Sequence, residues 1–311
     1  MLEKLLPSFS LLTLVKQARR LHLLPPVPKP IKSPLIRWFH QRQAIKRKQF
    51  KLSKIKKYGT FDDHELLNML RDAGIQGGDI LFVQCSLNDL YTFSGNPSSL
   101  LQVLLDLVGE TGTLLMPAFT TNTFSEPSRL FDPDLEPTYT GLVNELFRRS
   151  PGVIRSLHPR HSICGKGPMA SALLVGHENC VRADGPGSPF DRLRQCDRAK
   201  ILTLGLPPAF VSFLHWVEDF EPEKLPFPVH EKEPRKCLVK LADDRIITVT
   251  DWLVRASLSD KVSFQKIANH LSDAAMHLWT YKGIQFGLYP FHSLTEELLT
   301  WRDAGIIHYD K

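Results

Sequence analysis

Several patterns that would identify a common class of protein are missing from this 311-residue sequence. Its five cysteines include no CxxC pair, so the sequence indicates neither a disulfide framework nor a cysteine-based zinc site. Free thiols are typical of a reducing compartment, and we therefore predict a cytoplasmic protein. No apolar run reaches the roughly 20 residues that a membrane-spanning helix needs. Glycine-rich phosphate loops, the HExxH motif and the GxSxG element are also absent, which argues against nucleotide, metalloprotease and serine-hydrolase chemistry.

Acidic residues are almost missing from one end of the chain. Residues 1–60 hold 15 lysines and arginines and a single acid, Glu3, whereas the rest of the chain holds more acidic than basic residues. The sequence pI of about 9.0 therefore reflects the N-terminal segment. We predict no nucleic-acid partner for the remainder.

The basic segment, residues 1–57, is predicted to be a helical extension that contains a proline-rich link at 24–34. Leucines and the aromatic residues Trp38 and Phe39 are interleaved with lysine and arginine, which suits an anionic membrane surface. Such contact would place the protein on the inner face of the membrane. The alternative is a basic arm that packs on its own globular part or on a partner.

Residues 58–311 are predicted to form one α/β domain. Helical stretches such as 61–75 and 98–109 alternate with segments that contain short apolar strands, such as 77–87, 111–119 and 199–206. This alternation predicts a central mixed, mostly parallel sheet with helices on both faces. Residues 235–250 alternate around an Asp-Asp turn and are predicted to form an antiparallel hairpin, and the chain closes with two helical stretches around GIQFGLYPF.

Three segments carry candidate chemistry, and one of them is the glycine- and proline-rich loop at 183–193. In residues 154–170, a bent strand is crowded by cationic side chains, which suits an anionic group such as a pyrophosphate, although an ordinary strand and turn with solvated charges would have the same composition. In the third segment, a buried strand ends at Gly205 and a helix begins near Ser212, with His215 in its first turn. Ligands bind at the carboxyl ends of strands in α/β sheets, so His215 is a candidate catalytic residue, although a lone histidine is more often structural.

Taken together and in order, the segments resemble the aminoglycoside 3-N-acetyltransferase family. The resemblance covers residues 60–225 well and 226–311 loosely, and residues 1–55 lie outside it. It is carried by GGDILFVQCSL (77–87), GTLLMPAF (112–119), FDP (131–133), PGVIRSLHPRHSICGKGPMA (151–170), GPGSPFDRL (185–193), LTLG (202–205) and SFLHWVE (212–218).

The resemblance implies direct transfer of an acetyl group from acetyl-CoA to an amine, without a metal. It assigns His215 as the general base and Glu218 as its carboxylate partner. It places the residues that bind the cofactor at Ser86, Leu87, Arg155, Ser156, His158, Ser162 and Gly167. For the acceptor it suggests Glu126, Asp184, Ser212 and Asp251.

The chain departs from the family pattern at several positions. Gln84 replaces the usual histidine, Ser212 replaces the usual threonine, and Glu126 is the only acid in the segment between GTLLMPAF and FDP. A polycationic antibiotic needs more acids than this, so we predict an amino sugar with a single free amine as the acceptor. Two alternatives stay open: an enzyme with Cys85 as a covalent nucleophile, and a non-catalytic scaffold that binds CoA or is tethered to a membrane. The sequence does not indicate an oligomeric state.

Overall fold

The computed structural model describes residues 34–120, 129–258 and 260–310. The chain divides into two compact units, Met1–Leu52 and Ser53–Lys311, and the division falls inside helix α2 (Pro34–Tyr58). In the first unit, the α2 side chains from Ile45 to Leu52 are exposed. The helix expected before the proline-rich link lies outside the described residues. No helix within the described ranges is long and apolar enough to cross a membrane.

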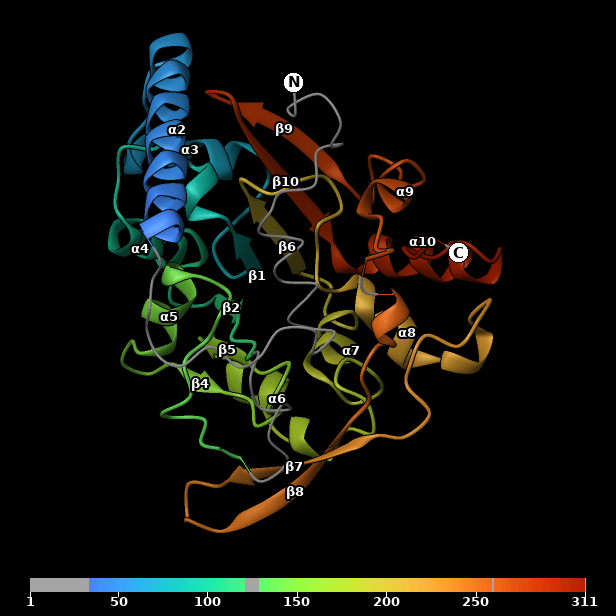
Figure 1. Ribbon diagram of the computed structural model, residues 1–311. Coiled ribbons are helices and arrows are strands. Elements are labelled where there is room, and N and C mark those ends of the chain that lie inside the picture. The colour runs from blue at the N-terminus through green and yellow to red at the C-terminus, as the bar shows by residue number, and fades with distance from the viewer. Residues whose placement is uncertain (1–33, 121–128, 259, 311) are drawn as a thin grey trace. The chain divides into compact units, whose positions relative to one another are not determined.

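The second unit is built on a seven-stranded sheet (Figure 1). Its strands, in spatial order, are β4 (Ile154–Arg155), β5 (Ile163–Lys166), β2 (Thr113–Pro117), β1 (Ile80–Cys85), β6 (Ala199–Leu204), β10 (Ile284–Pro290) and β9 (His277–Tyr281).

Parallel pairing is confined to the centre of this sheet. Strand β1 pairs in parallel with β2 and β6, and every other neighbouring pair among the seven strands is antiparallel. The mixed sheet is confirmed, but its parallel part is smaller than expected. The reason is that β4–β5 and β9–β10 are joined by connections too short for a crossover helix, which forces antiparallel pairing. The sequence pattern did not predict β9.

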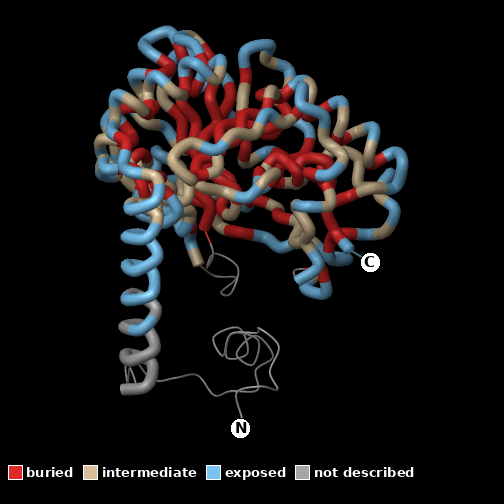
Figure 2. The backbone as a smooth tube through the Cα atoms, turned by 90° about the horizontal axis from the view of Figure 1, so that it is seen from above, coloured by how far each residue is buried: buried red, intermediate tan, exposed pale blue. Residues whose placement is uncertain are grey.

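Helices cover both faces of the sheet, as predicted. One core contains residues of α3 (Asp63–Asp72), α4 (Pro97–Val108) and α5 (Leu142–Arg148). The other contains residues of α6 (Ala170–Leu174), α7 (Pro189–Leu193), α8 (Leu214–Phe220) and α10 (Phe291–Asp303). Side chains of β1 alternate between the cores, because successive residues of a strand point to opposite faces. Figure 2 shows these central segments as the buried part of the chain.

A second, three-stranded sheet contains β3 (Leu130–Phe131), β7 (Arg235–Lys240) and β8 (Ile246–Asp251). The antiparallel β7–β8 pair is the hairpin that the sequence predicted. Its turn places Asp244 at a φ of 63°, a left-handed conformation that aspartate tolerates better than most residues. The remaining elements are short: α9 (Phe264–Ala268), η1 (Leu87–Asp89), η2 (His177–Asn179), η3 (Pro222–Lys224) and η4 (Ala256–Leu258).

Candidate active site

A pocket of about 630 Å³ opens beyond the carboxyl ends of β1, β2 and β6. Residues from these strand ends and from the first turn of α8 line it, among them Gln84, Cys85, Ser86, Pro117, Ser212 and His215. Aromatic side chains contribute further walls, and the described lining contains no aspartate, glutamate, lysine or arginine. Two histidines, His161 and His215, are among the lining residues. A pocket with these walls suits an uncharged or weakly charged group.

His215 meets a buried carboxylate one helical turn away. Its Nδ1 lies 2.9 Å from Oε1 of Glu218 within α8. The His215 side chain is 29% exposed and lines the pocket, whereas that of Glu218 is only 2% exposed. The arrangement therefore presents an accessible imidazole that is held from behind by an inaccessible carboxylate.

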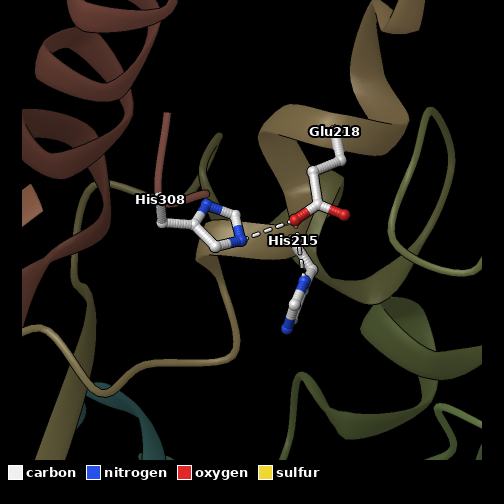
Figure 3. Close-up of side chains that lie close together, drawn as sticks. All are labelled: His215, Glu218 and His308. Carbon is white, nitrogen blue, oxygen red and sulfur yellow. Dashed lines mark hydrogen bonds and ion pairs between the residues drawn. The ribbon is translucent and has the colours of Figure 1, made fainter. Parts of the chain in front are cut away.

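A second histidine contacts the same carboxylate oxygen (Figure 3). Nε2 of His308, which follows α10, lies 2.6 Å from Oε1 of Glu218, but this close contact is not aligned as a regular hydrogen bond. The His215 and His308 rings meet edge to face with their centroids 5.3 Å apart. Glu218 thus serves two imidazoles, one in the pocket and one buried.

These contacts and the burial of the side chains shift the pKa values of His215, Glu218 and His308. Burial lowers the pKa of His215, but the Glu218 carboxylate outweighs that effect, so the pKa is raised overall. Burial raises the pKa of Glu218, and the two imidazoles reverse this, leaving its pKa well below its usual range. For His308 burial prevails and the pKa is lowered. Because an ionised carboxylate can only accept, Nδ1 of His215 carries the proton, and neutral His215 has its lone pair on Nε2.

The same three side chains offer donor atoms that a divalent cation can use. One nitrogen or oxygen from each lies within 4.8 Å of the others. Two histidines and a glutamate are also the donor set of some catalytic zinc sites. That no metal is needed therefore stays a prediction, which a chelator can test.

The loop before α8 is fixed to β1 by a reciprocal pair of hydrogen bonds. The Ser212 amide donates to Oε1 of Gln84 at 2.8 Å, and Nε2 of Gln84 donates to the Ser212 hydroxyl oxygen at 2.9 Å. The His215 amide in turn donates to the Ser212 carbonyl at 3.1 Å. The position of His215 is thus tied through one turn of chain to the central strand.

His161 stands beside His215, with ring centroids 6.3 Å apart. Its Nε2 is 2.5 Å from Nη1 of Arg160 and its Nδ1 is 2.7 Å from Oδ2 of Asp184. Since arginine only donates, Nε2 accepts and Nδ1 donates, so the ring is neutral. Burial and Arg160 accordingly lower the pKa of His161 well below its usual value. Both of its nitrogens are occupied, so His161 shapes the pocket and does not offer a second base.

Two of the acids suggested for the acceptor, Asp184 and Asp251, are buried against partners within the protein. Asp184 pairs with His161, and burial raises the pKa of its carboxyl to about 6. Asp251 accepts from Nε of Arg160 at 2.9 Å and is fully buried. Neither lines the pocket, whereas Ser212 does. Glu126 lies outside the described residues.

The side chains suggested for the cofactor divide into two groups. Ser86 and Leu87 line the pocket. Ser156, His158 and Ser162 are buried, and the Ser156 and Ser162 hydroxyls bond within the protein, to His177 and to the Ala118 carbonyl. These buried side chains lie away from the pocket lining.

Arg155 and Gly167 both contact backbone carbonyl groups of the protein itself. The Arg155 guanidinium donates to the carbonyls of Ala118, Pro133 and Glu136. It borders a second hollow, of about 510 Å³, beside β4 and β7. A Cβ at Gly167 would fall 2.3 Å from the Gly112 carbonyl oxygen, so glycine is required there by close backbone contact.

Cys85 lines the pocket as a thiol. Burial raises the pKa of the Cys85 thiol to about 12, and its sulfur lies 4.0 Å from Oδ1 of Asn144. A nucleophilic cysteine needs its thiolate, which a nearby cation or base would stabilise. This environment favours packing over covalent catalysis.

The sequence did not indicate the role of His308 or the contacts with Arg160 and Asp184 that keep the His161 ring neutral. His161 stood in the crowded 154–170 segment, so a signal existed for it. His308 follows α10 in a part of the chain where no motif marked it.

Comparison with known proteins identifies the family of this chain. A family described as aminoglycoside 3-N-acetyltransferase matches residues 82–301. Aminoglycoside N(3)-acetyltransferase III from a Salmonella species is 33% identical over 165 residues, which are 48% of this chain and 57% of that protein. The chain therefore spans little more than half the length of this relative. Aminoglycoside N(3)-acetyltransferase IX from Micromonospora chalcea is 31% identical over 256 residues, which are 76% of this chain and 80% of that protein.

The fold comparison leads to the same group. The crystal structure of aminoglycoside acetyltransferase AAC(3)-Xa superposes with a TM-score of 0.70 at 22% identity, covering 85% of this chain and 99% of that one. At this identity the likeness concerns the fold. The family match extends over most of the second unit, from β1 into α10. The chain belongs to the aminoglycoside 3-N-acetyltransferase family.

Proposed function

We propose that this protein transfers the acetyl group of acetyl-CoA to an amino group of an amino sugar or aminoglycoside-like acceptor, with His215 as general base. One observation carries the proposal: His215 is accessible in the pocket while its Nδ1 is fixed by the buried Glu218. Membership of the family supports the reaction class.

The proposed step is a direct transfer. The acceptor nitrogen attacks the thioester carbonyl carbon while Nε2 of His215 removes a proton from that nitrogen. The carbonyl π electrons move to oxygen, and their return breaks the carbon–sulfur bond. The CoA thiolate leaves and takes the proton from His215. Positioned general-base help of this kind contributes about 10²–10⁴-fold to the rate.

The donor is expected to reach the pocket at Ser86 and Leu87, which line it. Arg155, Ser156, His158, Ser162 and Gly167 are proposed to support donor binding through the backbone they hold, because their side chains are buried or engaged within the protein. Substitution of these residues would therefore lower both the stability of the fold and the affinity for acetyl-CoA.

For the acceptor we propose an amino sugar with one free amine. The described pocket lining carries no carboxylate. Asp184 is buried against the neutral His161, Asp251 is paired with Arg160, and neither acid lines the pocket. Several ammonium groups would lose their hydration in such a pocket without gaining counter-charges. A single amine can enter in its neutral form, which is also the nucleophilic form.

The test measures release of CoA thiol from acetyl-CoA with glucosamine, nucleotide-linked amino sugars and gentamicin, followed by mass measurement of the product. We expect N-acetylated amino sugar, full activity in the presence of EDTA, and little reaction with gentamicin. His215→Ala is the matched control for spontaneous transfer. Absence of CoA release with every amine would overturn the proposed activity, whereas loss with EDTA would assign a metal to the histidine–glutamate trio.

We also propose that residues 1–57 hold the protein at an anionic membrane surface. The proposal rests on the run of cations without acids in α2, several of which are exposed. Such a position would bring the pocket near a lipid-linked amino sugar.

A further inference from the structure

Two departures from the family pattern are in contact with each other. Gln84 and Ser212 form the reciprocal pair that joins the end of β1 to the turn before α8. We propose that this pair orients the Ser212 hydroxyl as the hydrogen-bond donor to the thioester carbonyl oxygen, with Ser212 as a catalytic residue and Gln84 as a positioning residue. This rests on the proposed function, which it deepens.

The direction of the Ser212 proton follows from the pair itself. The Ser212 amide can only donate, so the Gln84 atom 2.8 Å from it must be the carbonyl Oε1. The Nε2 amide group then faces the Ser212 hydroxyl oxygen at 2.9 Å and donates to it. Since the Ser212 oxygen accepts on that side, its own proton has to point away from Gln84.

On the side away from Gln84, the Ser212 hydroxyl proton faces the pocket. Ser212 is half-buried and lines the pocket together with His215. Among the described residues, no acceptor bonds to the Ser212 proton, so the hydroxyl keeps a free donor beside the base. Gln84 itself is only 7% exposed, so water competes little for the amide that fixes this arrangement.

Several other donors at the strand end are already occupied. The Ser86 hydroxyl donates to the Asp89 carboxylate and the Ser86 amide donates to the Leu204 carbonyl. The Thr140 hydroxyl and the Asn144 amide group donate to the Pro117 carbonyl. Ser212 is therefore the better-placed donor for the negative charge that develops on the carbonyl oxygen. Removing one such donor costs about 10²–10³-fold in kcat.

The first test is Ser212→Ala with acetyl-CoA and the best amino-sugar acceptor. We expect kcat to fall about a hundredfold, the KM for acetyl-CoA to stay within about threefold, and the pH midpoint of kcat/KM to stay where it is in the wild type. A displaced His215 would move that midpoint, which separates a lost donor from a structural defect. Ser212→Thr, which keeps the hydroxyl, should restore most of the lost rate.

The second test changes the direction of the Ser212 hydroxyl proton but keeps the two residues hydrogen-bonded to each other. In Gln84→Glu, a carboxylate can accept from both the amide and the hydroxyl of Ser212, which turns the serine proton away from the pocket. We expect a kcat loss similar to that of Ser212→Ala, and no further loss when the two changes are combined. Gln102→Glu places the same charge on an exposed site of α4 and should retain wild-type rates.

Each result is decisive. Wild-type turnover that depends on His215 establishes the proposed function separately, so the variants test only this inference. Retention of kcat in Ser212→Ala would overturn the donor role, and retention in Gln84→Glu alone would overturn the orienting role. Tyr139 lines the pocket and is 57% exposed, and Tyr139→Phe removes its hydroxyl. A hundredfold loss there, with Ser212→Ala active, would assign the donor to Tyr139 instead.

Discussion

Nδ1 of His215 lies 2.9 Å from Oε1 of Glu218, and the two residues are separated by one turn of α8. Helical geometry alone brings positions i and i+3 together, so the pair needs no other element to form. What the tertiary structure adds is unequal burial, since the carboxylate is shielded and the imidazole faces the pocket. The base therefore stays accessible while its counter-charge does not.

The pH dependence of kcat/KM should reveal this pair. Glu218 raises the pKa of His215, and a protonated His215 cannot accept a proton, so the rate should rise with pH through that raised pKa. In Glu218→Gln, burial acts on the imidazole without the carboxylate, and the rising limb should move to lower pH. The acceptor amine titrates equally in both proteins, so the difference between the two profiles isolates His215. Identical rising limbs in the wild type and in Glu218→Gln would contradict the assignment of His215 as a base whose pKa is raised by Glu218.

Replacement of the base should separate chemistry from binding. We expect His215→Ala to lower kcat at least about a hundredfold, while acetyl-CoA at a hundred times its Kd still stabilises the protein against unfolding by about 2.7 kcal/mol. Turnover and thermal unfolding with and without CoA measure the two effects. Near-normal turnover in this variant would remove His215 from the mechanism.

The sequence predicted the parts of this molecule that local patterns encode. Alternation of apolar strands and helices predicted the layers. The family resemblance carried by SFLHWVE pointed to His215 and Glu218, and the structure brings these two side chains into contact. It could not predict His308, because that contact joins α8 to the segment after α10, and a long-range contact leaves no local pattern.

Charged residues were the least predictable. The cations of residues 154–170 suggested a phosphate site, yet Arg155 donates to backbone carbonyls and Arg160 pairs with Asp251. Composition shows that a charge is present but not which partner neutralises it. The extent of parallel pairing was overestimated for a related reason, since strand direction depends on connection length and on which strands become neighbours.

The Cys85 thiol should prove dispensable. Burial raises the pKa of Cys85 to about 12, so little thiolate exists at neutral pH. We expect Cys85→Ser to keep most of the wild-type kcat in the CoA-release assay. Loss of turnover with a retained fold, together with an acetylated wild-type enzyme trapped on Cys85, would favour a covalent route.

Arg155 should matter for stability more than for the donor. Arg155→Met removes the donor to the carbonyls of Pro133 and Glu136 and leaves the Ala118 carbonyl with the Ser162 hydroxyl alone, at roughly 1–3 kcal/mol for each group that stays unsatisfied. We expect a clear fall in the unfolding midpoint without CoA. Arg149→Met removes an exposed guanidinium from α5's end and should change the midpoint little. Unchanged stability in Arg155→Met, with weaker CoA binding, would return Arg155 to the donor site.

The basic helix offers a test in the full-length chain. Each cation near an anionic bilayer contributes about 1 kcal/mol, so the protein should sediment with phosphatidylserine vesicles at low salt and release as salt rises. Reversing the exposed charges of Lys46, Arg47, Lys48 and Lys51 to glutamate should weaken sedimentation while acetyl transfer continues. Equal sedimentation of both proteins would show that these residues do not hold the membrane.

The contact of His308 with Glu218 has a consequence for how such a site can diversify. His215 and Glu218 share one short helix and would be inherited together, whereas His308 arrives from a separate stretch beyond α10. An exchange of C-terminal segments between related chains could therefore replace the buried neighbour of the carboxylate and leave the base itself intact. The strength of the base would then be adjusted by a part of the protein that lies outside the lining of the pocket.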